Sequence, residues 1–145
     1  MEDYQAAFLQ RHQDTEVLHA SARKVAAMHF GGCTIECLLK SIILDSLQGN
    51  SSREWKTKSN NPGHEVTNPG HNFQKALQKH DRLRSRIERI PDVKKWLQTV
   101  EYPNQHQHFI EMRYSDHDPQ DASYKEWCQA YQSLRNWLLK QGTQL

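Results

Sequence analysis

The amino-acid sequence predicts an all-α fold, a four- to five-helix antiparallel (up-and-down) bundle. Apolar residues recur at helical spacing through most of the chain, and clusters of turn-forming residues separate the periodic segments. No segment alternates β-branched and polar residues over four or more positions, as a half-buried strand would. The 145 residues suit a single domain spanning 1–145, with enough chain to bury a modest core.

The first two helices are predicted at 4–20 and 24–47. The first contains good helix formers without Gly or Pro, and the pattern pauses at 21–23. The second is the longest apolar segment of the chain and is apolar on most sides, so we expect it at the centre of the bundle. Gly31 and Gly32 in its interior each cost on the order of 1 kcal/mol relative to Ala. We therefore expect a close helix crossing at this point.

A long polar loop is predicted after the second helix, at about 48–69. Trp55 and Val66 are its only bulky apolar residues, and Asn-Pro-Gly-His occurs twice, at 61–64 and 68–71. A segment with so few apolar residues buries too little apolar surface to offset the entropy lost on ordering, so we expect this loop to be flexible.

Further helices are predicted in the second half of the chain. The apolar positions from Phe73 to Ile90 form one stripe, which predicts a third helix over 71–90. Pro91 suits the first position of a short fourth helix that ends before Pro103. After an irregular segment, Asp118 or Asp121 is expected to cap a final helix that runs to about residue 141.

Composition predicts a cytoplasmic protein without a membrane segment. No run of even fifteen apolar residues exists, and the first residues carry acids where a secretory signal would carry lysines. The cysteines Cys33, Cys37 and Cys128 are odd in number and have apolar neighbours. We expect them to be free thiols in a reducing compartment.

Charge is unevenly distributed along the chain despite a net charge of only +2. Between residues 73 and 95 there are eight Lys and Arg against three acids, and between 111 and 126 there are five acids against two basic residues. Unlike charges on one surface favour self-association, and we expect a homodimer. The alternative interpretation is that these charges are solvated helix faces.

Four residues of the second helix, His29, Cys33, Glu36 and Lys40, fall within about 60° on a helical wheel. We call this set the polar strip. It could line a groove for a nucleotide or a partner protein, or it could be a structural polar network that fixes helix positions. The strip is a poor zinc site, because ligands spaced along one straight helix drift apart. A second group of possible metal ligands, His106, His108 and His117, lacks a further residue to complete the site. We therefore predict no metal and no cofactor.

Several segments resemble the HEPN family of helical domains. Asp14-Thr-Glu-Val-Leu18 and the segment 23–40, which ends in Glu36-Cys-Leu-Leu-Lys40, are similar to the first two helices of that family. Gly70-His71-Asn72-Phe73 resembles the family's Gly-His-x-Leu start of the third helix, and Met112-Arg113-Tyr114-Ser115 resembles an Arg-Tyr segment before the last helix. The resemblance covers most of the chain except the loop. It adds His71 and Tyr114 to the residues expected at a ligand or partner groove.

The resemblance implies a compact helical bundle, frequent dimerisation, and association with a nucleotidyltransferase in a toxin–antitoxin-like pair. In its RNase members an Arg and a His, separated by four to six residues near the last helix, form an active site shared across a dimer. Here Arg113 and His117 are separated by only three residues. Arg23 and His29 are separated by five, but about 1.7 such matches are expected by chance, and the pair lies on a different helix from the family's motif.

Arg113, Asp116 and His117 are the catalytic candidates. RNA cleavage without a metal needs a base for the 2′-hydroxyl proton, which a His supplies, and a cation for the developing negative charge, which an Arg supplies. The leading hypothesis is an HEPN-like module that binds a partner protein or a nucleotide. The alternatives are a metal-independent endoribonuclease that uses Arg113 and His117 in a dimer, and a structural accessory bundle without chemistry.

Overall fold

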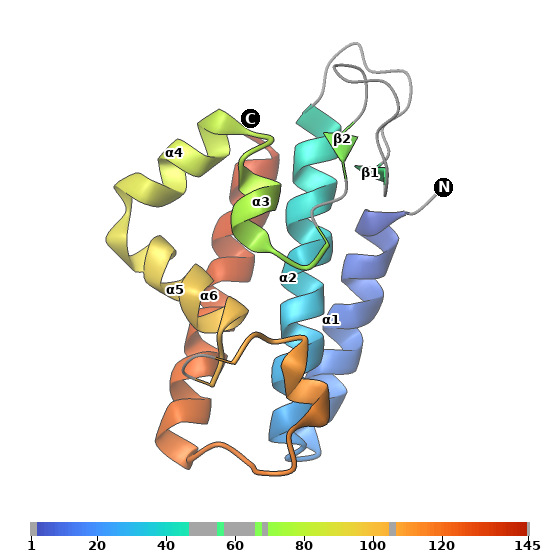
Figure 1. Cartoon of the computed structure of the whole chain (residues 1–145), viewed down its shortest axis with the longest axis vertical. Helices are drawn as coiled ribbons and strands as arrows, with labels where there is room; N and C mark the ends of the chain where they lie inside the picture. Colours follow the sequence, from blue (N-terminus) through green and yellow to red (C-terminus); the bar gives the residue numbers. More distant parts are fainter. Residues whose placement is uncertain (1–2, 47–54, 57–65, 68–69, 105–106, 145) are drawn as a thin grey trace.

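The computed structural model describes residues 3–46, 55–56, 66–67, 70–104 and 107–144. It confirms the all-α fold (Figure 1). Six α-helices and one 3-10 helix account for most of the described residues, and three of the α-helices are long.

The first two helices are confirmed almost to the residue. Helix α1 spans Tyr4–Ala20 and begins where the Asp3 carboxylate accepts a hydrogen bond from the Ala6 amide at 2.9 Å. Helix α2 spans Lys24–Ser46. Ala22, in the turn between them, has a φ of 58°. This left-handed conformation lets the chain reverse direction within three residues, so that α1 and α2 pack antiparallel (Figure 1).

The two interior glycines of α2 confirm the expected close packing. A Cβ at Gly31 would overlap the indole ring of Trp127, and a Cβ at Gly32 would overlap the ring of Phe109. Both aromatic rings are buried. The glycines therefore lower the helix propensity of α2, but they allow two aromatic side chains to pack closely against it.

The single third helix predicted over 71–90 is wrong. The chain forms α3 at Phe73–Leu77 and α4 at Asp81–Arg89, separated by a turn. The imidazole Nδ1 of His80 accepts a hydrogen bond from the Leu83 amide at 3.0 Å and so starts a new helix. A helical wheel places His80 on the apolar stripe, but its side chain caps α4 rather than continuing one helix.

The last two α-helices match their predicted ranges. Helix α5 spans Pro91–Glu101, with Pro91 in its first turn as expected. Helix α6 spans Asp121–Gly142. The predicted Asp cap of α6 is wrong, because Gln120 is the N-cap residue and makes no side-chain cap. The Asp121 carboxylate instead lies 2.5 Å from the Lys24 ammonium at the start of α2.

Helices α2 and α6 run in the same direction, and the chain between them returns in short pieces. In Figure 1, α1 descends, α2 and α6 ascend, and the return descent is made by the chain from α4 to the 3-10 helix η1 (Glu111–Tyr114). Helix α2 contacts α1, α3, α5, α6 and η1. It is therefore the central helix that the sequence predicted.

The predicted loop at 48–69 lies mainly outside the described residues. Its expected flexibility therefore stays a prediction. Its described parts are two strands of two residues each, β1 (Trp55–Lys56) and β2 (Val66–Thr67), which pair in parallel. The sequence had predicted no strand. A pair this short gives too little periodicity to recognise.

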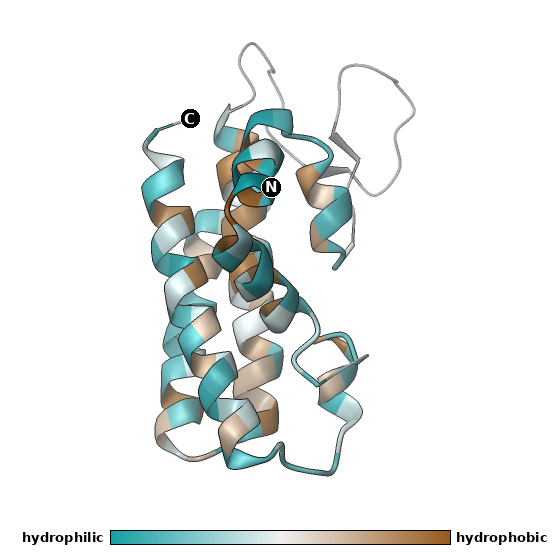
Figure 2. Ribbon diagram, turned by 90° about the vertical axis from the view of Figure 1, so that its left-hand side faces the viewer, coloured by the Kyte–Doolittle hydropathy of each residue, from teal (hydrophilic) through white to brown (hydrophobic). Residues whose placement is uncertain are grey.

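The core is continuous along α2 and includes residues from every described α-helix. Figure 2 shows brown apolar bands alternating with teal hydrophilic ones along the helices, which is the pattern of amphipathic helices around a shared core. Helix α2 is long and apolar enough to cross a membrane by length and composition, but 67% of its most apolar window is buried in the bundle. This burial agrees with the central position of α2 in the bundle.

Candidate functional site

A pocket of about 410 Å³ lies where the turn between α1 and α2 meets η1 and the segment that follows it. We call it the corner pocket. Two segments about ninety positions apart line it, and their residues are Ala22, Arg23, Lys24, Val25, Ala26, His29, Phe30, Met112, Arg113, Ser115, Asp116 and Asp118. The pocket therefore combines the first turns of the central helix with a segment just before the last one.

Three cationic side chains line the corner pocket. Arg23 and Arg113 are exposed, and the Arg113 guanidinium lies over the Tyr114 ring at 4.8 Å from its centroid. Lys24 is already paired with Asp121, and this hydrogen bond raises the pKa of the lysine. The two arginines are thus the pocket cations most available to an anionic ligand.

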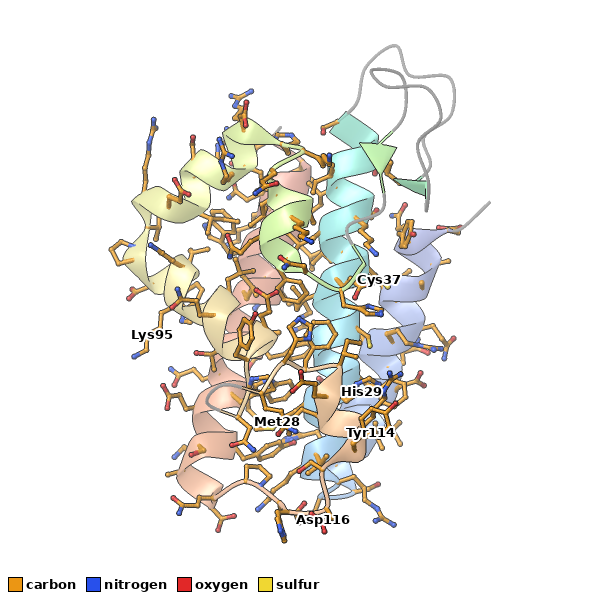
Figure 3. All side chains as sticks on the ribbon, viewed as in Figure 1. Met28, His29, Cys37, Lys95, Tyr114 and Asp116 are labelled. Carbon is orange, nitrogen blue, oxygen red and sulfur yellow. The ribbon has the colours of Figure 1, made fainter. Side chains whose placement is uncertain are left out.

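His29 is held in one orientation at the pocket. Its Nδ1 lies 3.0 Å from the backbone carbonyl oxygen of Phe109. Because a carbonyl oxygen only accepts, Nδ1 carries the proton, and in the neutral imidazole Nε2 is left as an acceptor. Phe109 can approach because Gly32, one turn further along α2, has no side chain. In Figure 3, His29 and Tyr114 are both drawn beside the lower half of α2, against which η1 packs.

The predicted catalytic residues are only partly brought together. Arg113 and Asp116 line the corner pocket, but His117 is not among its lining residues. The His117 imidazole lies 3.4 Å from the Asp116 carboxylate, and its side chain is 90% exposed. The nearby histidine of the pocket is His29, which the sequence had assigned to the polar strip.

The part of the polar strip at Glu36 and Lys40 is a partly buried network rather than an open groove. The Glu36 carboxylate contacts the Lys40 ammonium at 3.0 Å and Nδ1 of His71 at 2.6 Å. The side chains of Glu36 and Lys40 are only 13% and 4% exposed, and the ammonium also lies over the Tyr4 ring. These contacts join α2 to α1 and to the chain before α3. They favour the structural alternative for this part of the strip.

Cys33 has no sign of a reactive thiol. Burial raises its pKa to about 12, so the thiol stays protonated near neutral pH. Cys33, Cys37 and Cys128 are half-buried, and none of the three forms a disulfide, as predicted. In the described part of the chain, no three His, Cys, Asp or Glu side chains are grouped as metal ligands would be.

The two residues added by the family resemblance lie apart from each other. His71 is in the polar strip network, on Glu36, and Tyr114 is in η1 with a side chain that is 77% exposed. The predicted ligand groove thus divides into two regions of α2. Only its lower part, at His29, belongs to the corner pocket.

Sequence reasoning missed two features of this region. Arg23 was set aside because its spacing to His29 is common by chance, yet both residues line the pocket. The basic pair Arg23-Lys24 at the beginning of the most apolar helix was a usable signal.

Glu101 was also missed: its buried carboxylate accepts a hydrogen bond from the Phe73 amide at 2.9 Å and lies 3.4 Å from Nε2 of His108. Burial raises the pKa of this carboxyl group.

Comparison of the chain with protein-family models, with curated proteins and with solved structures found no match.

Proposed function

We propose that this chain is an HEPN-like helical module whose corner pocket binds a ligand with a phosphate group, such as a nucleotide. The observation that carries the proposal is that Arg23 and Arg113, from two distant segments, line one pocket at the start of a 23-residue helix. The first amides of a helix lack intrahelical acceptors and carry partial positive charge, so they favour anions. The arginines add paired donors that match phosphate oxygens.

The pocket suits a small ligand better than a long polyanion. Its volume of about 410 Å³ lies within the range of about 300–1,000 Å³ typical of small-molecule sites. Phe30 provides a half-buried ring in the wall, against which a base could stack. Asp116 and Asp118 on the same wall oppose further negative charge. A single phosphate group with an attached base fits this balance.

A titration calorimetry experiment with AMP and adenosine tests the proposal, because the two compounds differ only in the phosphate. We expect AMP to bind and adenosine to bind at least about tenfold more weakly. Arg23→Ala and Arg113→Ala should each weaken AMP binding by about tenfold, which corresponds to about 1.4 kcal/mol for a charged hydrogen bond. Arg89→Ala is the matched control, since Arg89 is an exposed arginine at the end of α4. Equal binding of AMP and adenosine, or an equal loss in Arg89→Ala, would refute the assignment.

The resemblance to the HEPN family also suggests the kind of partner. A nucleotidyltransferase in a toxin–antitoxin-like pair handles nucleotides, so a phosphate-binding pocket in its helical partner would act on the same class of ligand. The association requires a small nucleotidyltransferase gene beside this one, so the gene neighbourhood is the first test, and co-expression of the two proteins is the second. A stable complex that survives size-exclusion chromatography supports it, and the absence of any complex contradicts it.

RNA cleavage is a second candidate, favoured by the orientation of His29. With Nδ1 bound to the Phe109 carbonyl, Nε2 can accept the 2′-hydroxyl proton. The 2′-oxygen then attacks phosphorus, and the bond to the 5′-oxygen breaks as that oxygen takes a proton from an acid or from water. Arg23 and Arg113 would stabilise the added negative charge, and the exposed His117 could supply the acid.

Cleavage of a short RNA in the presence of EDTA tests this second candidate. We expect His29→Gln to lose at least about a hundredfold in rate, since a general acid–base group contributes typically 10²–10⁴-fold. Arg113→Ala should lose a similar factor, since removing one donor to the developing negative charge costs about 10²–10³-fold. His117→Ala shows whether the exposed histidine takes part. A wild-type rate no higher than that of the His29→Gln, Arg113→Ala double variant would leave only the binding function.

A further inference from the structure

A second pocket, of about 150 Å³, lies between α1 and α6 and shares no lining residue with the corner pocket. We call it the seam pocket. Two hydrogen bonds join the same pair of helices. Nδ1 of His12 lies 2.7 Å from the Tyr131 hydroxyl, and Nδ1 of His19 lies 2.7 Å from the Tyr124 hydroxyl. Two histidine–tyrosine pairs thus hold together the helices that form the pocket.

The seam pocket contains two buried donors that have no acceptor. In the described part of the chain, three buried side-chain polar atoms lack a hydrogen-bond partner, and they are Nε of Arg11, Nε1 of Trp127 and Nε of Arg135. Arg11 Nε lies 3.1 Å from the Asp14 carboxylate, which accounts for it. The other two atoms both belong to residues that line the seam pocket. Because buried donors are almost always paired, these two indicate an acceptor that the described chain does not supply.

The surroundings of Trp127 hold its indole in place at the pocket. Its ring stacks with those of Tyr124 and Tyr131, at centroid distances of 5.9 and 5.2 Å and interplanar angles of 14° and 9°. The two tyrosines lie about one helical turn before and after Trp127, so they cover its two faces. Its benzene carbons pack against Gly31. An edge of the indole is therefore what lines the pocket, and with the residue only 2% exposed the N–H cannot turn to solvent.

The guanidinium of Arg135 is half-buried, and its partners carry no negative charge. Within the described part of the chain, its hydrogen bonds go to the His12 imidazole and to the Asn136 amide. Burial, followed by Arg135 itself, lowers the pKa of His12, so at neutral pH the imidazole accepts a hydrogen bond without supplying charge. Glu16 is the acid among the lining residues, but its side chain is 62% exposed. A half-buried cation in this situation favours an anionic ligand.

We infer that the seam pocket binds the carboxylate of a short-chain organic acid, whose oxygens accept hydrogen bonds from the Arg135 guanidinium and the Trp127 indole. The inference does not depend on the proposed function. One guanidinium balances one negative charge, and a carboxylate accepts hydrogen bonds without donating any. The pocket is smaller than the range of about 300–1,000 Å³ typical of small-molecule sites, so only a few non-hydrogen atoms fit. The Tyr131 ring and the Cys128 side chain offer contacts to a short alkyl tail.

NMR titration of the ¹⁵N-labelled protein with sodium propionate tests the inference. Each of the four tryptophans gives one indole N–H signal. We expect the Trp127 signal to shift downfield and to saturate at millimolar propionate, while that of Trp137, half-buried on the same helix, stays in place. Propionamide has the same shape without the charge and should bind at least about tenfold more weakly. Trp127→Phe identifies the signal, and through-space contacts to neighbouring protons identify it if that variant does not fold.

Matched variants locate the site. Arg135→Gln should weaken propionate binding at least about tenfold, because it removes the charged donor. Arg89→Gln changes an exposed arginine on α4 and should leave the affinity unchanged. Arg23→Ala, at the corner pocket, should also leave the response of the Trp127 signal unchanged. Failure of the nucleotide proposal and failure of this inference are therefore distinguishable.

Glu16→Gln distinguishes a ligand from the chain's own carboxylate. If a ligand fills the pocket, the variant removes a like charge beside it and should strengthen propionate binding about two- to fivefold at low salt. The Trp127 signal of the unliganded variant should match that of the wild type. The inference is overturned by a Trp127 signal that ignores propionate, that responds equally to propionamide, or that moves on Glu16→Gln alone.

Discussion

The two halves of α2 place polar residues in opposite circumstances. In the upper half, Glu36 and Lys40 are almost completely buried and bind each other, His71 and the Tyr4 ring. At the start of the helix, Arg23 and the neighbouring Arg113 are exposed around a pocket. Buried charges must be satisfied within the chain, whereas exposed cations can bind a ligand without loss of stability. We therefore infer a structural role for the upper half of α2 and propose ligand binding at its lower end.

The largest expected effect is on the buried pair. Glu36→Ala leaves the Lys40 ammonium without its carboxylate, so we expect the free energy of unfolding to fall by about 1–3 kcal/mol. Urea denaturation measures this change. Glu16→Ala, at a carboxylate with a side chain that is 62% exposed, is the control and should change stability by less than about 0.5 kcal/mol. Equal effects of the two substitutions would show that the polar strip is not structural.

A smaller effect is expected from acid, at the contact between α1 and α6. Burial, followed by the nearby Arg135, lowers the pKa of His12, whose Nδ1 lies 2.7 Å from the Tyr131 hydroxyl. The unfolded chain therefore takes up a proton at His12 at a higher pH than the folded chain does. The stability contribution is complete above the unfolded pKa of about 6.5 and is lost as pH falls through the lower folded pKa.

Denaturation at pH 7.5 and pH 5 measures this dependence. We expect the wild type to be less stable at pH 5, and His12→Gln to lose less stability than the wild type over the same range. Comparing the two proteins cancels the opposite contribution of the buried Glu101, since both retain it. Identical pH profiles would show that His12 does not contribute.

At the corner pocket, removal of an acid should improve ligand binding. Asp116→Asn eliminates a negative charge from the pocket wall, and we expect AMP affinity to rise about two- to fivefold at low salt. Titration at 20 mM and 300 mM NaCl should show the gain shrinking as salt screens the charge. If Asp116 instead serves RNA cleavage, the same variant will cleave more slowly while binding more tightly. A loss of AMP affinity would contradict the proposed role of the pocket charges.

The smallest effect is expected for the ion pair between Lys24 and Asp121. The Asp121 side chain is 96% exposed, so Asp121→Ala should leave the midpoint of urea denaturation unchanged within error. It also releases the Lys24 ammonium at the pocket, which should slightly strengthen AMP binding. A large loss of stability would show that this pair fixes α2 to α6.

The sequence by itself determined the fold class, the central position of α2 and the ranges of α1, α2, α5 and α6. These properties depend on local periodicity and on Gly and Pro, which act over a few residues. Only the tertiary structure decided that the stripe over 71–90 breaks at His80, because capping competes there with continuation of the helix. It also decided that Arg23, His29 and Arg113 share a pocket. These three residues come together because of how α1, α2 and η1 pack. Arg113 lies about ninety positions from Arg23, and no sequence spacing predicts a contact over that distance.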